Sequence, residues 1–189
     1  MEGLLLGLGL VVIIAYLWYV SLVKKRNAGR EALSGIDVQI NKRSNLVPNI
    51  LKIAQTFMDH EKALLTDITE LRAQVSKSYD ANDIADIGEH LAVAEQLNNK
   101  MGQLMGKVEA YPELKSDNTM LEAMQTYNEI EVHLSAARRF YNAAVTELNH
   151  AVEIFPGSIL ASMANIKIMP FYEADDAAKA SIDAADFIK

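Results

Sequence analysis

The sequence opens with an uncharged run, 3-GLLLGLGLVVIIAYLWYVSLV-23, which is followed directly by Lys24, Lys25 and Arg26. At about 1.5 Å per residue, a helix of these 21 residues spans about 31 Å, which matches the hydrocarbon core of a bilayer. A cleaved signal peptide needs cations before a shorter apolar core and small residues after it. Here Glu2 precedes the run and aromatic residues stand near its end, so the run predicts an uncleaved transmembrane anchor.

The end of the anchor has the composition of a membrane boundary. Aromatic rings and cationic groups both favour the headgroup layer. The chain supplies there Tyr16, Trp18 and Tyr19, and then Lys24, Lys25, Arg26 and Arg30. We expect the four cations to contact lipid headgroups. By the positive-inside rule, the excess of cations between residues 24 and 43 predicts an outside N-terminus and a cytoplasmic position for residues 24–189.

Three glycines lie in the first half of the anchor, namely Gly3, Gly7 and Gly9. Gly3 and Gly7 have the Gly-x-x-x-Gly spacing that lets two helices approach closely in lipid. This spacing favours self-association of the anchor.

Charge and composition limit the function classes. The net charge is −7, and residues 44–189 alone carry −10, which argues against nucleic-acid binding. The chain has no cysteine, so disulfides and thiolate metal sites are excluded. We divide it into an anchor (1–23), a basic juxtamembrane segment (24–35), a helical bundle (36–169) and an acidic tail (170–189).

A 4-3 spacing of mainly apolar residues begins at Ile36 and continues to Val75. It predicts one amphipathic helix of about forty residues, about 60 Å long. Pro48 lies inside this helix and removes the backbone hydrogen bond to the carbonyl of Ser44. We therefore expect a kink or local loosening between Arg43 and Pro48.

Two further long helices are expected. The second has apolar positions from Ile84 to Val108, with turn and cap chemistry before it at residues 80–83. The third has apolar positions from Leu121 to Phe155, with a cap from Ser116, Asp117 or Asn118. A short amphipathic helix could follow up to Pro170, packed in the core, on a neighbour or on the bilayer. The chain thus predicts an all-α fold, with a transmembrane helix before an elongated antiparallel up-and-down bundle of three long helices and a shorter fourth.

Five short motifs follow one another along the chain. They are Ile-Asp-Val-Gln to Leu-Val-Pro-Asn at 36–49, YPELK at 111–115, ARRFYN at 137–142, Leu-Asn at 148–149 and Phe-Pro at 155–156. Together they resemble the LemA family. The resemblance implies a single-pass bacterial inner-membrane protein with a cytoplasmic four-helix bundle and no established enzymatic activity. The motif residues singled out are Pro48, Asn49, Tyr111, Pro112, Tyr141, Asn142, Phe155 and Pro156.

Four charged residues fall on the apolar stripes: Arg43, Glu61, Glu131 and Arg138. Unpaired buried charges are costly, so each should have an ionic partner or lie near solvent. One interpretation is an interhelical ion-pair network that fixes register, and the other is a polar site inside the bundle.

Enzymatic chemistry finds little support in the sequence. A di-iron bundle needs two Glu-x-x-His pairs, and only Glu147 with His150 has that spacing. There is no Gly-rich phosphate loop and no Gly-x-Ser-x-Gly elbow. We therefore expect a non-enzyme without catalytic residues, metal or cofactor.

Two function classes remain. One is a membrane scaffold that assembles into a homo-oligomer through its anchor and long helices in the lipid bilayer. The other is a monomeric adaptor that presents an acidic bundle to an unknown cytoplasmic protein. From Glu173 onward, the Ala-rich acidic sequence is typical of a solvated tail or one ordered by a partner.

Overall fold

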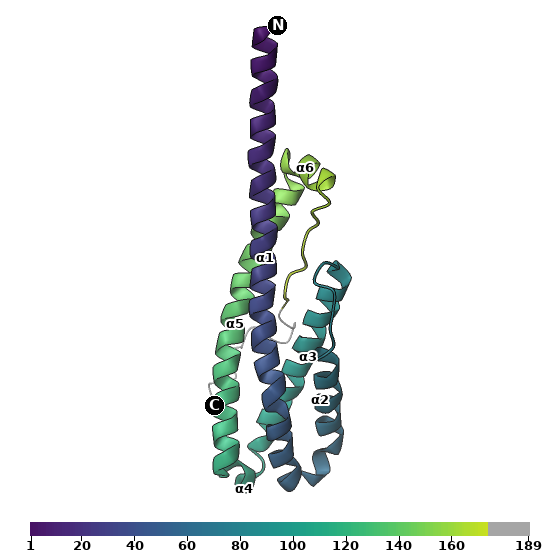
Figure 1. Ribbon diagram of the computed structural model, residues 1–189. Helices are drawn as coiled ribbons and strands as arrows, with labels where there is room; N and C mark the ends of the chain where they lie inside the picture. Colours follow the sequence, from purple (N-terminus) through teal and green to yellow (C-terminus); the bar gives the residue numbers. More distant parts are fainter. Residues whose placement is uncertain (174–189) are drawn as a thin grey trace, which may run out of the picture.

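The computed structural model describes residues 1–173, which form helices and connecting segments without a strand in that range. The elements are α1 (Glu2–Phe57), the 3-10 turn η1 (Asp59–Glu61), α2 (Lys62–Val75), α3 (Ile84–Val108), α4 (Pro112–Lys115), α5 (Asn118–Glu153) and α6 (Gly157–Met163). Figure 1 shows α1, α2, α3 and α5 running in alternating directions along one long axis. The predicted all-α up-and-down bundle is confirmed.

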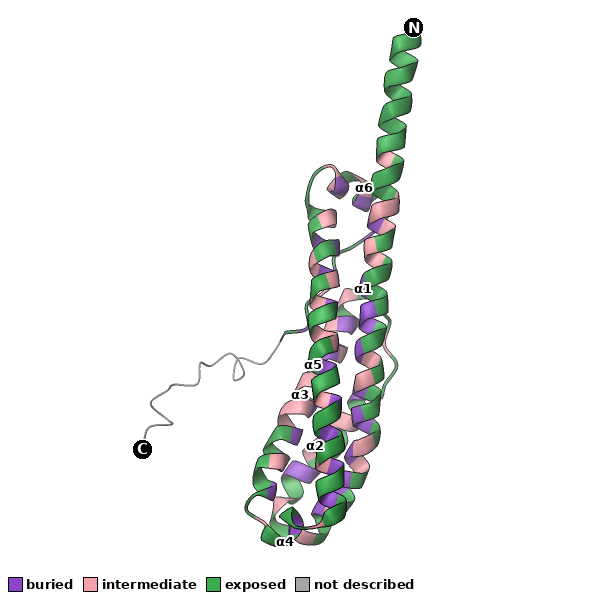
Figure 2. Ribbon diagram, turned by 90° about the vertical axis from the view of Figure 1, so that its left-hand side faces the viewer, coloured by how far each residue is buried: buried purple, intermediate pink, exposed green. Residues whose placement is uncertain are grey.

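Helix α1 carries both the apolar span predicted as the anchor and the first bundle helix without a break. Its first turns project beyond the bundle with their side chains exposed on all sides (Figure 2). Among the described residues, α1 alone is long and apolar enough to cross a membrane. Burial begins at Leu22 and continues through Leu33 and Ile36, which pack in the core. The bundle therefore follows the anchor with no flexible linker.

The first bundle helix ends earlier than the heptad pattern predicted. A single helix from Ile36 to Val75 is wrong, because α1 stops at Phe57 and the chain reverses through η1 into α2. Leu64 and Ile68 of α2 stay buried, because α2 turns its own apolar stripe toward the same core. The heptad phase continues across a reversal of chain direction.

Pro48 does not interrupt α1, contrary to the local loosening expected there. The carbonyl of Ser44, which loses its helical partner at Pro48, accepts a hydrogen bond of 2.8 Å from Nε of Arg72 on α2. The Ser44 hydroxyl also lies 3.2 Å from that of Ser76. A buried carbonyl is costly only when unpaired, so the contact with Arg72 stabilises the proline-containing turn.

Helices α3 and α5, which are the second and third long helices predicted from the sequence, each begin at a side-chain cap. The carboxylate of Asp83 accepts from the Ala85 amide at 2.7 Å, and that of Asp117 accepts from the Met120 amide at 2.8 Å. Both satisfy amides that lack a helical acceptor. Helix α5 ends at Glu153, so Phe155, which the sequence predicted as its last apolar residue, lies outside it.

Two residues expected in the apolar core of the third helix are exposed instead, namely Leu121 and Phe155. Leu121 lies in the first turn of α5, on the side away from the core, and Phe155 follows the end of the helix. Apolar periodicity alone could not distinguish these positions from buried ones.

Helix α6 is shorter than expected and ends at Met163, not near Pro170. The amides of Asn165 and Ile166 donate back to the carbonyls of Ser162 and Ala161, and Asn165 has φ of 50°. Asparagine tolerates this left-handed conformation, which allows the paired hydrogen bonds that close a helix. Residues 164–173, called the strap below, then run back along the bundle. The predicted acidic tail lies outside the described residues from position 174 onward.

Candidate functional site

Arg43 on α1 is the largest fully buried side chain of the core, with 1% of its surface exposed. Its guanidinium donates to the carboxylate of Glu131 on α5 and lies 5.4 Å from the centre of the Tyr127 ring. Its Nε and Nη1 atoms are buried without a hydrogen-bond partner among the described residues. Burial lowers the pKa of Arg43 from its ordinary value. This ion pair joins α1 to α5, with Arg43 buried in the core and Glu131 partly exposed at its edge.

Arg138 on α5 forms a second pair, with Glu95 on α3 at 2.6 Å. The same guanidinium donates to the Tyr172 hydroxyl at 3.1 Å and lies 4.3 Å from the centre of the Tyr172 ring. Burial raises the pKa of Tyr172, so the phenol keeps its proton at neutral pH. Arg138 thereby links two helices and the strap.

Further pairs connect helices along the bundle. Lys107 on α3 reaches Glu61 at 2.6 Å, and Lys25 on α1 binds Glu147 on α5. Thus all four charged residues on the predicted stripes form ion pairs between elements, since Arg43 and Glu131 pair with each other. The two buried arginine pairs join specific positions on neighbouring helices, so they favour one register of these helices.

Two asparagines on α5 hold the strap through its backbone. The Asn149 side chain donates to the Met169 carbonyl and accepts from the Met169 amide, both at 2.9 Å. Asn142 makes the same two bonds with Tyr172, at 3.0 and 2.9 Å. The hydroxyl of Tyr141 donates to the Pro170 carbonyl at 2.7 Å. The side chains of α5 thus replace the partner strand that an extended segment would otherwise need.

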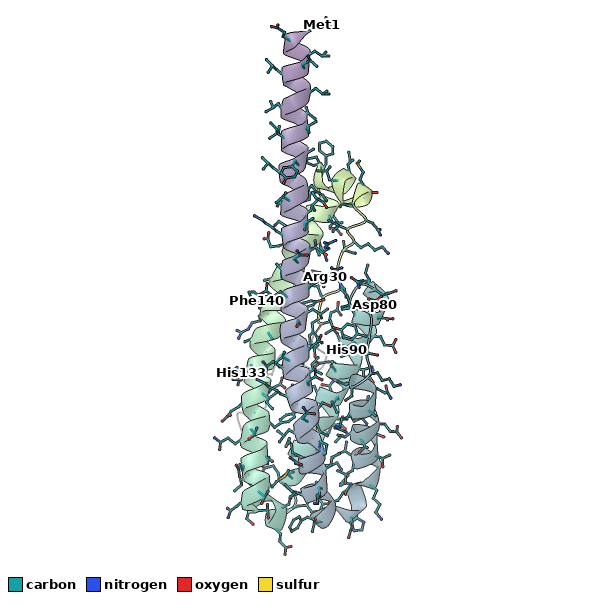
Figure 3. The ribbon with its side chains drawn as sticks, viewed as in Figure 1. Met1, Arg30, Asp80, His90, His133 and Phe140 are labelled. Carbon is teal, nitrogen blue, oxygen red and sulfur yellow. The ribbon has the colours of Figure 1, made fainter. Side chains whose placement is uncertain are left out.

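A third polar cluster joins α1, α3 and the loop between α2 and α3. The Asp37 carboxylate accepts from the Tyr79 hydroxyl at 2.8 Å and contacts Nε2 of His90 at 3.1 Å. The two rings stack with centroids 4.2 Å apart, and Figure 3 labels His90 between the helices. Burial, followed by the Asp37 contact, raises the pKa of Tyr79. A carboxylate that orients a histidine is two parts of a hydrolase triad, but here a protonated phenol shares the carboxylate.

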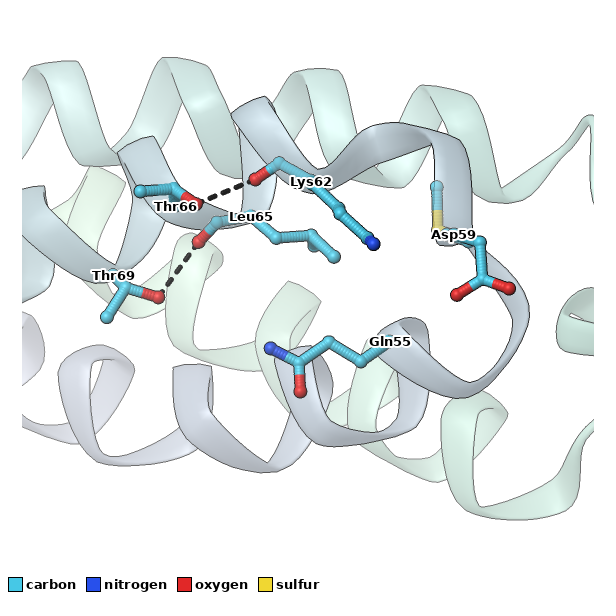
Figure 4. A pocket seen from close by; sticks show the side chains of 7 residues that line it. Gln55, Asp59, Lys62, Leu65, Thr66 and Thr69 are labelled. Carbon is cyan, nitrogen blue, oxygen red and sulfur yellow. Dashed lines mark hydrogen bonds between the residues drawn. The ribbon is translucent and has the colours of Figure 1, made fainter.

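A hollow of about 420 Å³ lies at the turn between α1 and α2 (Figure 4). The hydroxyls of Thr66 and Thr69 on its wall donate to carbonyls of their own helix, at 2.8 Å each. Gln55, Asp59 and Lys62 supply the remaining polar groups of the lining. Both hydroxyls therefore donate within their own helix, and neither is paired with a general base that would activate it.

The remaining site predictions fall into three groups. Gly3, Gly7 and Gly9 have open space around them, and Tyr16, Trp18 and Tyr19 lie on the exposed anchor. Of the four basic residues, Lys24 is exposed, Arg26 is half-buried, Lys25 binds Glu147 and Arg30 donates to Asn82. Of the motif residues, Asn49, Pro112 and Phe155 are exposed, whereas Pro48, Tyr111 and Pro156 are half-buried.

Sequence reasoning missed the strap and the Asp37 cluster. The Leu-Asn motif at 148–149 and the repeat of asparagine at 142 and 149, seven residues apart, were the available signals. That spacing places both asparagines on one face of a helix. For the predicted Glu-x-x-His coincidence, Glu147 is bound to Lys25. Within residues 1–173, no three His, Asp or Glu side chains gather as a metal site would require.

The sequence is similar to a known protein family and to several curated proteins. A sequence profile of the LemA family matches residues 32–185. Magnetosome proteins MamQ 1 and MamQ 2 of Paramagnetospirillum magneticum are each 24% identical over 160 residues, covering 74% of this chain and 59% of theirs. Magnetosome protein MamQ of Magnetospirillum gryphiswaldense is 22% identical over 159 residues, covering 74% and 58%. The chain therefore spans less than two thirds of the length of these relatives.

Proposed function

This chain belongs to the LemA family, and from that premise we propose that it is a membrane-anchored scaffold that assembles with copies of itself. The observation that carries the proposal is the continuity of α1 from the apolar span into the core. A bundle joined to its anchor by an unbroken helix cannot move independently of the anchor, so every copy in one membrane has the same height and direction. Identical faces of neighbouring copies then meet at the same level, which favours a symmetric contact.

A candidate contact face lies on the outer side of α5. Val132 and Phe140 are each about two thirds exposed, and Ala136 lies between them on the same helix face. Figure 3 shows Phe140 and His133 on the side of α5 away from α1. The heptad stripe from Ile36 to Val75 is no longer a candidate for this contact, because the bundle covers it internally.

We expect detergent-solubilised protein to form a discrete species larger than a monomer. Substituting Val132 with Glu, or Gly7 with Ile, should shift the mass toward the monomer, as measured by light scattering during gel filtration. Val132→Glu places a charge on the outer face of α5, and Gly7→Ile blocks close approach of the anchors. Val38→Glu is the matched control, because Val38 is an exposed valine on α1. A monomeric mass in several detergents and in lipid nanodiscs would favour the adaptor hypothesis instead.

The proposed location is the bacterial inner membrane, with the N-terminus outside and the bundle in the cytoplasm. The cations that follow the anchor support this orientation. The chain has no cysteine, so a cysteine at the exposed position Lys77 gives an unambiguous reporter. In intact cells, Lys77→Cys should resist a membrane-impermeant thiol reagent until the membrane is opened. Labelling in intact cells would contradict this orientation and place the bundle outside the cytoplasm.

A further inference from the structure

The connection between α5 and α6, together with α6 itself, forms an uncharged segment that we call the elbow, defined as residues 154–163. No charged residue occurs between Glu153 and Lys167. Helix α6 packs against both α1 and α5 (Figure 1). Gly157 at its start is so close to α5 that an added Cβ would collide with the Ala151 carbonyl oxygen, and the same Cβ would lie 3.6 Å from the Trp18 ring. The elbow therefore lies directly beside the anchor at Trp18.

The position of Trp18 sets the depth of the elbow. A helix needs about 20 residues to cross a hydrocarbon core of about 30 Å, so the run from Gly3 must be used almost to Val23. Trp18 lies five residues before Val23, or about 8 Å toward the bilayer centre along the helix. Residues packed against Trp18 consequently overlap the depth of the acyl chains.

The outer side of the elbow is mainly apolar, as a surface at the depth of the acyl chains has to be. Gly157 and Ala161 face inward and are buried. The outward side chains are mainly apolar and largely exposed, including Phe155 at 74% and Met163 at 80%, together with Ile154 and Ile159, and Ser162 is the exposed polar residue among them. Such a cluster would be unfavourable in water but stable in lipid.

The elbow is also held firmly before any membrane contact. Its last helical turn closes through the amides of Asn165 and Ile166. Below it, Asn149 on α5 binds the backbone of Met169, so the two ends of the connection are joined. A preformed apolar surface loses little conformational entropy when it enters lipid.

We propose that the elbow inserts into the same bilayer as the anchor, as a second membrane contact formed by Ile154, Phe155, Ile159 and Met163. The occupant of this surface is the acyl-chain and headgroup boundary of the lipid, because the surface is continuous with the membrane-spanning part of α1. Glu153 and Lys167 flank the elbow at its polar limits. The inference rests on the proposed membrane anchor and does not depend on self-assembly.

Single cysteines provide the test in the full-length protein, which has none of its own. Met163→Cys and Phe155→Cys report on the elbow. Leu121→Cys is the exposed control in the first turn of α5, and Leu10→Cys reports on the anchor. Each variant is labelled with an environment-sensitive fluorophore and reconstituted into phosphatidylcholine vesicles with a minority of phosphatidylglycerol, with or without brominated acyl chains.

We expect brominated lipid to quench the probes at residues 163 and 155 several-fold more than the probe at residue 121. Quenching at residue 10 without quenching at the elbow would overturn this inference and leave the anchor in place. Absence of quenching at residue 10 would overturn the anchor itself. A blue-shifted elbow probe that brominated lipid does not quench would assign the surface to a second protein copy, and would also overturn the inference.

Discussion

Replacing Glu131 with alanine is expected to destabilise the bundle by about 3–5 kcal/mol, because it leaves a buried charge without its ionic partner. Arg43 is enclosed by the core, and two of its guanidinium nitrogens already lack a hydrogen-bond partner within residues 1–173. Loss of Glu131 would leave the Tyr127 ring as the nearest compensating group. Urea unfolding of the solubilised protein, followed by circular dichroism, measures the change.

Replacing the other partner of the pair, Arg43, should lower the stability of the bundle much less. Arg43→Met removes the buried charge while it keeps an apolar side chain of similar length, and the carboxylate of Glu131, 34% exposed, can then be hydrated. In the double variant, Arg43→Met should therefore recover most of the stability lost with Glu131→Ala. Equal losses in the two single variants, without recovery in the double variant, would contradict this account and point to a net stabilising ion pair.

Replacing Asn149 with leucine is expected to release the strap from α5 at a cost of about 2–6 kcal/mol. The substitution leaves both the amide and the carbonyl of Met169 without a partner, and each unpaired buried group costs about 1–3 kcal/mol. Hydrogen exchange should show the amide of Met169 losing its protection first. The amide of Tyr172, which Asn142 binds, should be affected less.

Asn49→Leu is the control for this experiment, because Asn49 is an exposed asparagine on α1. It should leave the exchange of Met169 unchanged. If Asn149→Leu also left that exchange unchanged, the strap would be held mainly by Asn142, Tyr141 and Arg138 instead of by Asn149.

The periodicity of the sequence was sufficient to predict the helical bundle, because burial of an apolar stripe determines helix positions locally. The bounds of the second helix, Ile84 to Val108, agree with the prediction, since Asp83 is a clear cap and Tyr111-Pro112 follows the end. The reversal after Phe57 could not be predicted in this way. It contains neither glycine nor proline, and α2 resumes the same heptad phase.

Contacts between distant segments account for the other differences. The charges at Arg43 and Arg138 were recognised as needing partners, but Glu95 became identifiable as a partner only once α3 was placed beside α5. The effect of Pro48 depended on Arg72, which lies on a different helix. The strap has no periodic pattern, because its order comes from side chains of α5.

Because α1 is unbroken, a tilt of its apolar span also tilts the bundle helix that continues from it. From Leu22 to Phe57 its length is about 53 Å, and packing against α5 stiffens it over most of that distance. A transmembrane helix tilts when the thickness of the bilayer no longer matches its apolar length, and a tilt of about 10° would displace the far end by about 9 Å. In the proposed membrane arrangement, a difference in membrane thickness would therefore move the turn at Met58 sideways.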